Sequence, residues 1–252
     1  MRLGLVRLLV LAAAAASAAP ARKPQQWSRA ADRRLETDLC TIERVNASAL
    51  TRAQLEARFT GERRLIPALV LGAFPPASDA SWAKNWSRDS LLGQTLANPA
   101  LMALQKLPQA QARIPPAPHW LAQAVPPTTP VLVLGTRGSG TLFHNHGAAY
   151  NVLAYGAKRW YLHPPGWLGY TDIRGDVKDF HKLKLTVATY TQGFHARIKP
   201  FEAPLECMQR AGEMMYVPTG WQHATLNTRE AITWRVSACW RECADDGTDC
   251  CG

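Results

Sequence analysis

The chain has 252 residues, of which 29 are Lys or Arg and 19 are Asp or Glu, so its formal net charge is +10 at pH 7. This length suits one domain of about 180 to 220 residues with terminal extensions, which is enough to bury a full core. The basic residues are dispersed and include no recognisable reading helix or aromatic-basic RNA motif, so they indicate a solvated surface and no nucleic acid partner is expected.

Residues 1–18 have the composition of a secretory signal peptide. Arg2 and Arg7 form a basic n-region, a short Leu/Val/Ala run follows, and Ala16-Ser-Ala18 is a small-x-small cleavage site. A membrane anchor would need about twenty continuous apolar residues, and this run is shorter. No later stretch is long and apolar enough to span a bilayer. We therefore expect a soluble protein without a transmembrane span, in the secretory lumen or outside the cell.

Residues 19–60 are predicted to form an N-terminal helical region. Its best helical pattern is Thr51-Arg-Ala-Gln-Leu-Glu-Ala-Arg-Phe, with an apolar period near 3.6 and Thr51 as a candidate N-cap. Before it, Cys40-Thr-Ile-Glu-Arg-Val alternates like a short strand. After it, Leu65-Ile-Pro-Ala-Leu-Val-Leu-Gly72 predicts a buried strand, in which Pro67 indicates a sheet edge or a strand start.

Residues 82–107 are predicted to be partly helical, and the proline-rich residues 108–130 to be irregular. A long irregular segment inside a compact domain is often a lid or an insert. Because this one directly precedes an apolar strand and a block of histidines, it is a candidate wall for a site there. His119 and Trp120, which lie within it, are expected to pack rather than to take part in chemistry.

Three histidines stand in two short, strand-like blocks. The first is Thr141-Leu-Phe-His144-Asn-His146, and the second runs from Gly212 through Pro218-Thr-Gly-Trp-Gln to His223. Residues two apart on a strand project to the same face, so one metal ion could accept both imidazoles of the first block and a third from the second. The candidate metal ligands are therefore His144, His146 and His223.

Between the blocks, residues 150–165 predict a strand, a glycine turn carrying Lys158, a second apolar strand and a Pro-Pro stop. Residues 166–200 are expected to be a variable insert, because their acidic residues do not have the spacing of a calcium-binding EF-hand. Trp221 and Trp234 flank the later strands and are expected to pack in the core.

The cysteine count and two glycosylation triplets agree with a secreted or luminal protein. An even number of cysteines would pair in an oxidising compartment, and the six are Cys40, Cys207, Cys239, Cys243, Cys250 and Cys251. The last four crowd the C-terminal end, whose residues 241–252 form a Cys-rich tail. A structural zinc site there would lack the usual Cys-x-x-Cys pairs, so disulfides are favoured, with their connectivity open. Asn46-Ala-Ser48 and Asn85-Trp-Ser87 are candidate glycosylation sites.

The histidine blocks and the lysine turn resemble the JmjC family of cupin-fold oxygenases. The family pattern is His-x-acid, then Gly-x-Lys, then Gly-[Asp/Glu]-x-x-Tyr-x-Pro-x-x-Trp-x-His, and the resemblance covers roughly residues 40–240. It implies a mainly β fold with flanking helices (α+β), with a double-stranded β-helix or jelly-roll (cupin) barrel over residues 61–240.

The resemblance also implies a cofactor set and roles for individual residues. His144 and His223 match the two iron-binding histidines, Lys158 matches the lysine that pairs with the distal carboxylate of 2-oxoglutarate, and Thr141 matches a hydroxyl that holds the same carboxylate. Asn151 and Asn227 are possible polar groups of the pocket by family position. The implied activity is a protein hydroxylase that uses Fe(II) and 2-oxoglutarate.

The chain departs from the family at His146, where an acid is expected. A 2-His-1-carboxylate site neutralises one charge of Fe(II), whereas imidazole ligates without neutralising. Three alternatives stay open: a three-histidine Fe(II) site to which 2-oxoglutarate brings the negative charge, a Zn(II) site in a binding protein or hydrolase, and an inactive binding or scaffold protein. A luminal branch of the family likewise carries His-x-His. That likeness implies the endoplasmic reticulum lumen, with a protein substrate or luminal partner, and a monomer is the default.

Overall fold

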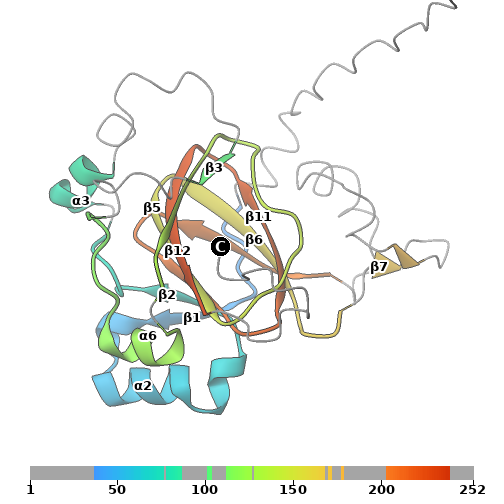
Figure 1. Cartoon of the computed structure of the whole chain (residues 1–252), viewed down its shortest axis with the longest axis horizontal. Helices are drawn as coiled ribbons and strands as arrows, with labels where there is room; N and C mark the ends of the chain where they lie inside the picture. Colours follow the sequence, from blue (N-terminus) through green and yellow to red (C-terminus); the bar gives the residue numbers. More distant parts are fainter. Residues whose placement is uncertain are drawn as a thin grey trace, which may run out of the picture.

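The fold is built on two β-sheets, which the computed structural model describes over residues 37–76, 78–86, 101–103, 112–126, 128–167, 170–171, 177–178 and 203–238 (Figure 1). The larger sheet has seven strands in the order β1-β2-β10-β5-β12-β4-β3, and all its pairs are antiparallel except β1 with β2. These strands are β1 (Glu43–Asn46), β2 (Ala68–Leu71), β3 (Leu101–Ala103), β4 (Val131–Gly135), β5 (Ala149–Tyr155), β10 (Met214–Val217) and β12 (Ala231–Ser237).

The smaller sheet holds the histidine blocks. Its strands are β11 (Gln222–Asn227), β6 (Ala157–His163) and β9 (Leu205–Arg210), in that order. An isolated β-bridge extends each edge of this sheet. His144 pairs with His223 on β11, and Cys40 pairs with Cys207 on β9. A separate antiparallel pair, β7 (Tyr170–Thr171) and β8 (Val177–Lys178), belongs to the region expected to be an insert.

From β5 onward, the chain crosses repeatedly between the two sheets. β5 leads into β6, β9 into β10 and β11 into β12, and each step crosses from one sheet to the other. Gly156 makes the first of these turns with a φ of +92°, and a Cβ there would stand 1.8 Å from the carbonyl oxygen of Glu230. The turn therefore requires glycine. The predicted strand, glycine turn and strand are confirmed, as is the mainly β fold; the described strands form separate sheets and no closed hydrogen-bonded barrel.

Short helices cover the face of the larger sheet that points away from the smaller one. They are α2 (Arg52–Thr60), α3 (Ala80–Asn85), α6 (His119–Ala124) and the 3-10 helices η1 (Ala47–Ala49) and η2 (Glu62–Leu65). Thr51 caps α2 and forms a capping box with Gln54, as predicted. Figure 1 shows α2 beside α6, where Phe59 stacks on Trp120 at a centroid distance of 4.9 Å. Trp120 therefore packs in the core, as expected.

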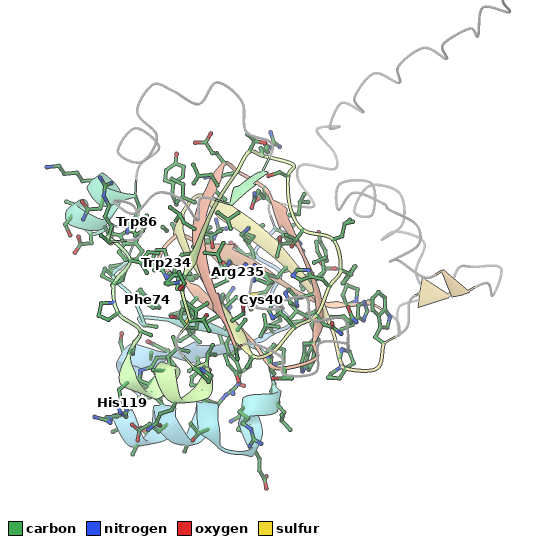
Figure 2. The ribbon with its side chains drawn as sticks, viewed as in Figure 1. Cys40, Phe74, Trp86, His119, Trp234 and Arg235 are labelled. Atoms are coloured by element: carbon green, nitrogen blue, oxygen red, sulfur yellow. A yellow bond between two sulfur atoms is a disulfide. The ribbon has the colours of Figure 1, made fainter. Side chains whose placement is uncertain are left out.

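Tryptophans join α3 to the same face of the sheet. Trp234 on β12 is fully buried and stacks on Trp86 at 4.8 Å between ring centroids, and Phe74 meets it edge-on at 5.7 Å (Figure 2). The packing role predicted for Trp234 is confirmed. None of the described helices is long and apolar enough to cross a membrane.

Within residues 19–60, the short strand predicted for residues 40–45 is present. β1 is a member of the larger sheet and Cys40 pairs with the smaller one, so residues 40–46 belong to the β fold. β2 starts directly after Pro67, as predicted, and the proline-rich segment contains α6. The predicted signal peptide (1–18), the predicted Cys-rich tail (241–252) and Cys239 lie outside the described residues.

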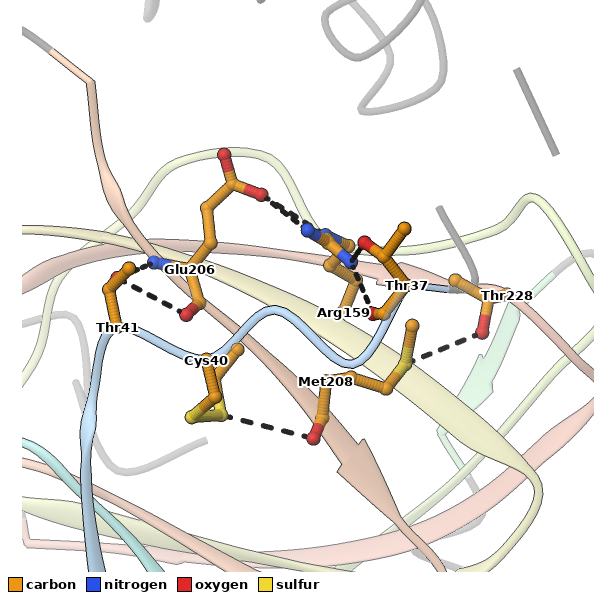
Figure 3. A network of polar contacts seen from close by, with 8 residues as sticks. Thr37, Cys40, Thr41, Arg159, Glu206, Met208 and Thr228 are labelled. Carbon is orange, nitrogen blue, oxygen red and sulfur yellow. Dashed lines mark hydrogen bonds and ion pairs between the residues drawn. A yellow bond between two sulfur atoms is a disulfide. The ribbon is translucent and has the colours of Figure 1, made fainter. Parts of the chain in front are cut away.

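The N-terminal segment is fastened to the outer edge of β9 (Figure 3). Cys40 and Cys207 form a disulfide between residues 167 apart in sequence. Beside it, the Thr41 amide donates to the Glu206 carbonyl oxygen at 2.8 Å, and the Glu206 amide donates to the Thr41 hydroxyl at 2.9 Å. The Arg159 guanidinium donates to the Glu206 carboxylate at 2.8 Å. Covalent, backbone and ionic contacts thus close this edge together.

Candidate metal centre

The imidazoles of His144, His146 and His223 face one another at the edge of the smaller sheet. His144 and His223 exchange backbone hydrogen bonds of 3.1 and 2.8 Å, which fixes their register. The ring centroids of His144 and His223 are 4.2 Å apart, those of His146 and His223 4.7 Å, and those of His144 and His146 5.4 Å. One nitrogen from each ring lies within 4.8 Å of the other two. The structure thus brings the three predicted ligands together.

Backbone carbonyls orient all three rings in the same sense. The Nδ1 atoms of His144, His146 and His223 lie 2.7, 2.8 and 2.9 Å from carbonyl oxygens, which belong to Leu142, Gly147 and Trp221. Because a carbonyl oxygen only accepts, each Nδ1 carries a proton and donates. In a neutral ring, Nε2 is then the atom that carries the lone pair able to ligate a metal. Metal-ligating histidines are commonly held in this way.

Burial keeps two of these rings neutral. It lowers the pKa of His146 to about 4, with a further contribution from the neighbouring His144. It also lowers the pKa of His223 well below the usual value. A protonated imidazole cannot ligate, so a ring that is already neutral binds a cation without losing a proton.

Gly140 holds the histidine segment (residues 138–146) tightly against β11. A Cβ at this position would stand 1.8 Å from the carbonyl oxygen of Thr225, so no larger residue fits without moving the segment. Nearby, the Thr225 amide donates to the Thr141 carbonyl oxygen at 3.0 Å, and the two hydroxyl oxygens lie 2.9 Å apart. The close approach sets the position of His144 relative to His223.

The three histidines open into a cavity of about 130 Å³ between the two sheets. Its walls combine apolar residues with uncharged polar groups and two cations, and no described residue among them is Asp or Glu. The lining residues are Val133, Thr141, His144, His146, Ala149, Tyr150, Asn151, Lys158, Trp160, Val217, His223, Thr225, Thr233 and Arg235. A metal ion held here would face a pocket whose described walls carry no carboxylate.

Lys158 is the most unusual of the lining residues. It lies on β6 and only 4% of its surface is exposed. No described residue forms a hydrogen bond or ion pair with its ammonium, and burial lowers its pKa to about 8. Thr141, the other predicted carboxylate ligand, lines the same cavity. Both predicted cosubstrate residues therefore share the cavity with the histidines.

The two predicted pocket asparagines have different places. Asn151 lines the cavity, but its side-chain oxygen accepts a hydrogen bond of 2.7 Å from the Thr233 hydroxyl. Asn227 is buried and does not line the cavity; its amide donates to the Ser139 hydroxyl at 3.0 Å and so fastens the loop before Thr141.

The remaining sequence candidates lie away from the cavity. Asn46 and Asn85, the candidate glycosylation sites, are both exposed, at the ends of β1 and α3. His119 is exposed on α6 and contacts Arg52 and Glu56. No described residue of the proline-rich segment lines the cavity, so a wall formed by this segment is not seen in residues 112–126 and 128–130.

Sequence reasoning missed Arg235, which lines the cavity from β12. A signal was present in the alternation of the strand. Ile232, Trp234 and Val236 belong to the core under the helices, so Thr233 and Arg235 must face the other side of the sheet. An arginine on the inward face of a buried strand is rare enough to indicate a site.

Comparison with known proteins gives partial matches. No protein-family model matches the chain. It is 41% identical over 95 residues to the Homo sapiens JmjC domain-containing protein 8, which covers 38% of this chain and 32% of that protein. It is 31% identical over 107 residues to the Danio rerio 2-oxoglutarate and iron-dependent oxygenase JMJD4, which covers 40% of this chain and 24% of that protein. The match thus spans about a third or less of the length of these relatives.

A solved structure, that of the Escherichia coli ribosomal oxygenase YcfD, overlaps 43% of this chain and 22% of that chain at 16% identity. The TM-score is 0.27, a value at which the overlap carries no inference. The sequence matches show similarity to JmjC proteins over part of the chain, and the three histidines form a possible metal site.

Proposed function

We propose that the chain is a JmjC-type protein that holds Fe(II) on His144, His146 and His223 and 2-oxoglutarate on Lys158 and Thr141. The observation that carries this proposal is the buried Lys158 ammonium, which no described residue pairs and which faces the same cavity as the three imidazoles. Burying an unpaired charge costs several kcal/mol. A bound ligand of opposite charge would offset this cost by forming an ion pair with Lys158.

The residues of the cavity suit these ligands. The carbonyl contacts at Nδ1 make Nε2 the ligating atom of each ring. Lys158 and the Thr141 and Thr225 hydroxyls offer hydrogen-bond donors to a carboxylate. A cavity of about 130 Å³ is close in volume to a cavity of roughly 150 Å³ that binds benzene, so it suits a small organic acid. Bound Fe(II) and 2-oxoglutarate would supply the oxidation of a C–H bond by dioxygen, while the protein positions the ligands and excludes water.

We further propose a fold type, a cellular compartment, a substrate class and an oligomeric state for this protein. The repeated crossing of the chain between two sheets from β5 onward supports a jelly-roll fold of the cupin type. The Cys40–Cys207 disulfide supports an oxidising compartment, in line with a signal peptide and the endoplasmic reticulum lumen. The substrate would be a side chain of a luminal protein, and the chain would act as a monomer.

The metal site is tested by anaerobic loading of the mature protein with Fe(II) or Co(II). We expect one ion per chain for the wild type and for His119→Ala, an exposed control histidine, and none for His223→Ala. Because the metal binds only the folded chain, a concentration a hundredfold above its Kd should raise the free energy of unfolding by about 2.7 kcal/mol. Equal metal content in the wild type and His223→Ala would reject the site.

The cosubstrate pocket is tested with Lys158→Met on the metal-loaded protein. A charge-assisted hydrogen bond contributes about 1.5 to 3 kcal/mol, so the affinity for 2-oxoglutarate should fall roughly ten- to hundredfold. Lys84→Met, an exposed lysine on α3, should leave it unchanged. Metal binding without any response to 2-oxoglutarate would favour the zinc or scaffold alternative over the oxygenase.

A further inference from the structure

Arg235 is half-buried and faces the space between the two sheets. It lies on β12 opposite Asn151 of β5, in the middle of the larger sheet. Its neighbours Trp234 and Val236 pack under the helices, so strand alternation turns Arg235 to the cavity side, where it lies among the lining residues. Figure 2 labels Arg235 beside the strands of the two sheets. Its guanidinium therefore belongs to the histidine cavity.

Arg235 differs from the other arginines buried in the described part of the chain. Arg58 pairs with the Glu43 carboxylate at 2.7 Å, and Arg159 pairs with that of Glu206 at 2.8 Å. No described carboxylate lies within ion-pair distance of Arg235, although it is half-buried. In this fold, buried guanidinium groups are matched by an acid, and Arg235 lacks one among the described residues.

The charge of the cavity calls for an anionic ligand. A divalent ion on three neutral imidazoles would bring two positive charges, and Lys158 and Arg235 bring one each. No described lining residue is acidic. Like charges in a half-buried space repel strongly because the effective dielectric is low. A ligand that fills this cavity must therefore carry more than one negative charge to balance it.

We propose that Arg235 binds a carboxylate of the ligand that coordinates the metal, so that the ligand brings the negative charge which an acid at position 146 would have supplied. This inference rests on the proposed metal site. The guanidinium offers parallel N–H donors that match the two oxygens of a carboxylate. With Lys158 in the same cavity, the ligand class is a small dicarboxylate whose ends are held by two different cations. Arg235 is thus a positioning residue for the metal-bound end.

The inference requires metal and carboxylate to bind cooperatively. The experiment titrates Co(II) into the full chain without oxygen and follows its visible absorption, with no carboxylate, with formate or with 2-oxoglutarate. For the wild type, 2-oxoglutarate should tighten Co(II) binding roughly ten- to hundredfold, the strength of a charge-assisted contact, and formate should tighten it less because it reaches only one cation. Equal effects of formate and 2-oxoglutarate would overturn the two-ended ligand.

Two variants isolate the role of Arg235. Arg235→Gln should bind Co(II) alone at least as tightly as the wild type, because a positive charge is gone, but should lose most of the tightening by either carboxylate. Arg229→Gln is the matched control, since this arginine is exposed and does not line the cavity. His146→Asp returns a protein carboxylate to the site and should reduce the dependence on added carboxylate.

The outcomes separate the two proposals. Failure of the wild type to bind Co(II) would reject the metal site and the inference with it. Wild-type binding that does not respond to carboxylates, or an Arg235→Gln variant that responds like the wild type, would overturn the inference and leave the metal site standing.

Discussion

At the scale of single residues, the site is defined by positive charges that no described residue pairs. The Lys158 ammonium is buried, and no described residue contacts it with a hydrogen bond. Burial favours the neutral amine, which is why the pKa of Lys158 falls to about 8 from 10.5. The buried ammonium makes the ligand-free folded protein less stable, and a bound carboxylate would form the missing ion pair.

This residue makes the stability of the ligand-free protein depend on pH. Between pH 8 and 10.5 the folded lysine is neutral while the unfolded chain still binds the proton. Raising the pH through this window therefore favours the folded state, by up to roughly 3 kcal/mol. Below pH 8 both states are protonated and the full penalty remains. We expect Lys158→Met to be more stable than the wild type, most of all below pH 8.

The measurement is urea unfolding of both proteins from pH 7 to 10.5, without metal or carboxylate. The difference between wild type and variant should shrink as the pH rises, whereas parallel curves would contradict the lowered pKa. In the metal-loaded wild type, 2-oxoglutarate affinity should decline above pH 8 as the ammonium loses its proton.

At the scale of elements, the sequence predicted the parts whose pattern is local. The strand before Gly156 and the strand after it, the cap at Thr51 and the start of β2 after Pro67 follow from period, turn and capping residues. The parallel pairing of β1 with β2 did not, because it depends on contacts between separate segments. Arg235 was missed although the alternation of β12 carried a signal, because the alternation does not say which face of the strand the helices cover.

The contact of residues 138–146 with β11 is the element-scale feature on which the metal site depends. Replacing Gly140 with alanine would place a Cβ 1.8 Å from the Thr225 carbonyl oxygen, so the segment must move outward. We expect this variant to lose metal affinity by tenfold or more, because His144 shifts while His223 stays on β11. The free energy of unfolding should fall by about 1 to 3 kcal/mol.

Metal titration and thermal unfolding of Gly140→Ala test this expectation, with Gly166→Ala as the control, because a Cβ at Gly166 meets nothing within 4 Å. The control has a positive φ of +84°, so it reports the cost of backbone strain alone. Equal metal affinity in the two variants would show that the close approach at Gly140 does not position the histidines.

At the scale of the whole molecule, the two sheets are joined at both edges of the smaller one. The histidine segment covers β11, and the segment around Cys40 covers β9 before it continues into β1 of the larger sheet. The sequence predicted that the cysteines pair but left the pairing open. The structure assigns Cys40 to Cys207, and the other four cysteines lie outside the described residues.

The Cys40–Cys207 disulfide closes a loop whose ends are 167 residues apart, so it restricts most of the unfolded chain. Loss of such a bond costs about 2 to 5 kcal/mol. Cys40→Ala should lower the free energy of urea unfolding by this amount, because Cys40 is only half-buried and little packing is lost with it. Leu39→Ala, an exposed neighbour, should change the free energy of unfolding far less.

Because Thr41 and Arg159 still hold the edge of β9 in Cys40→Ala, metal affinity at the opposite edge of the smaller sheet should stay unchanged. If Cys40→Ala loses stability and metal binding together, the smaller sheet transmits strain from one edge to the other and the two closures are not independent.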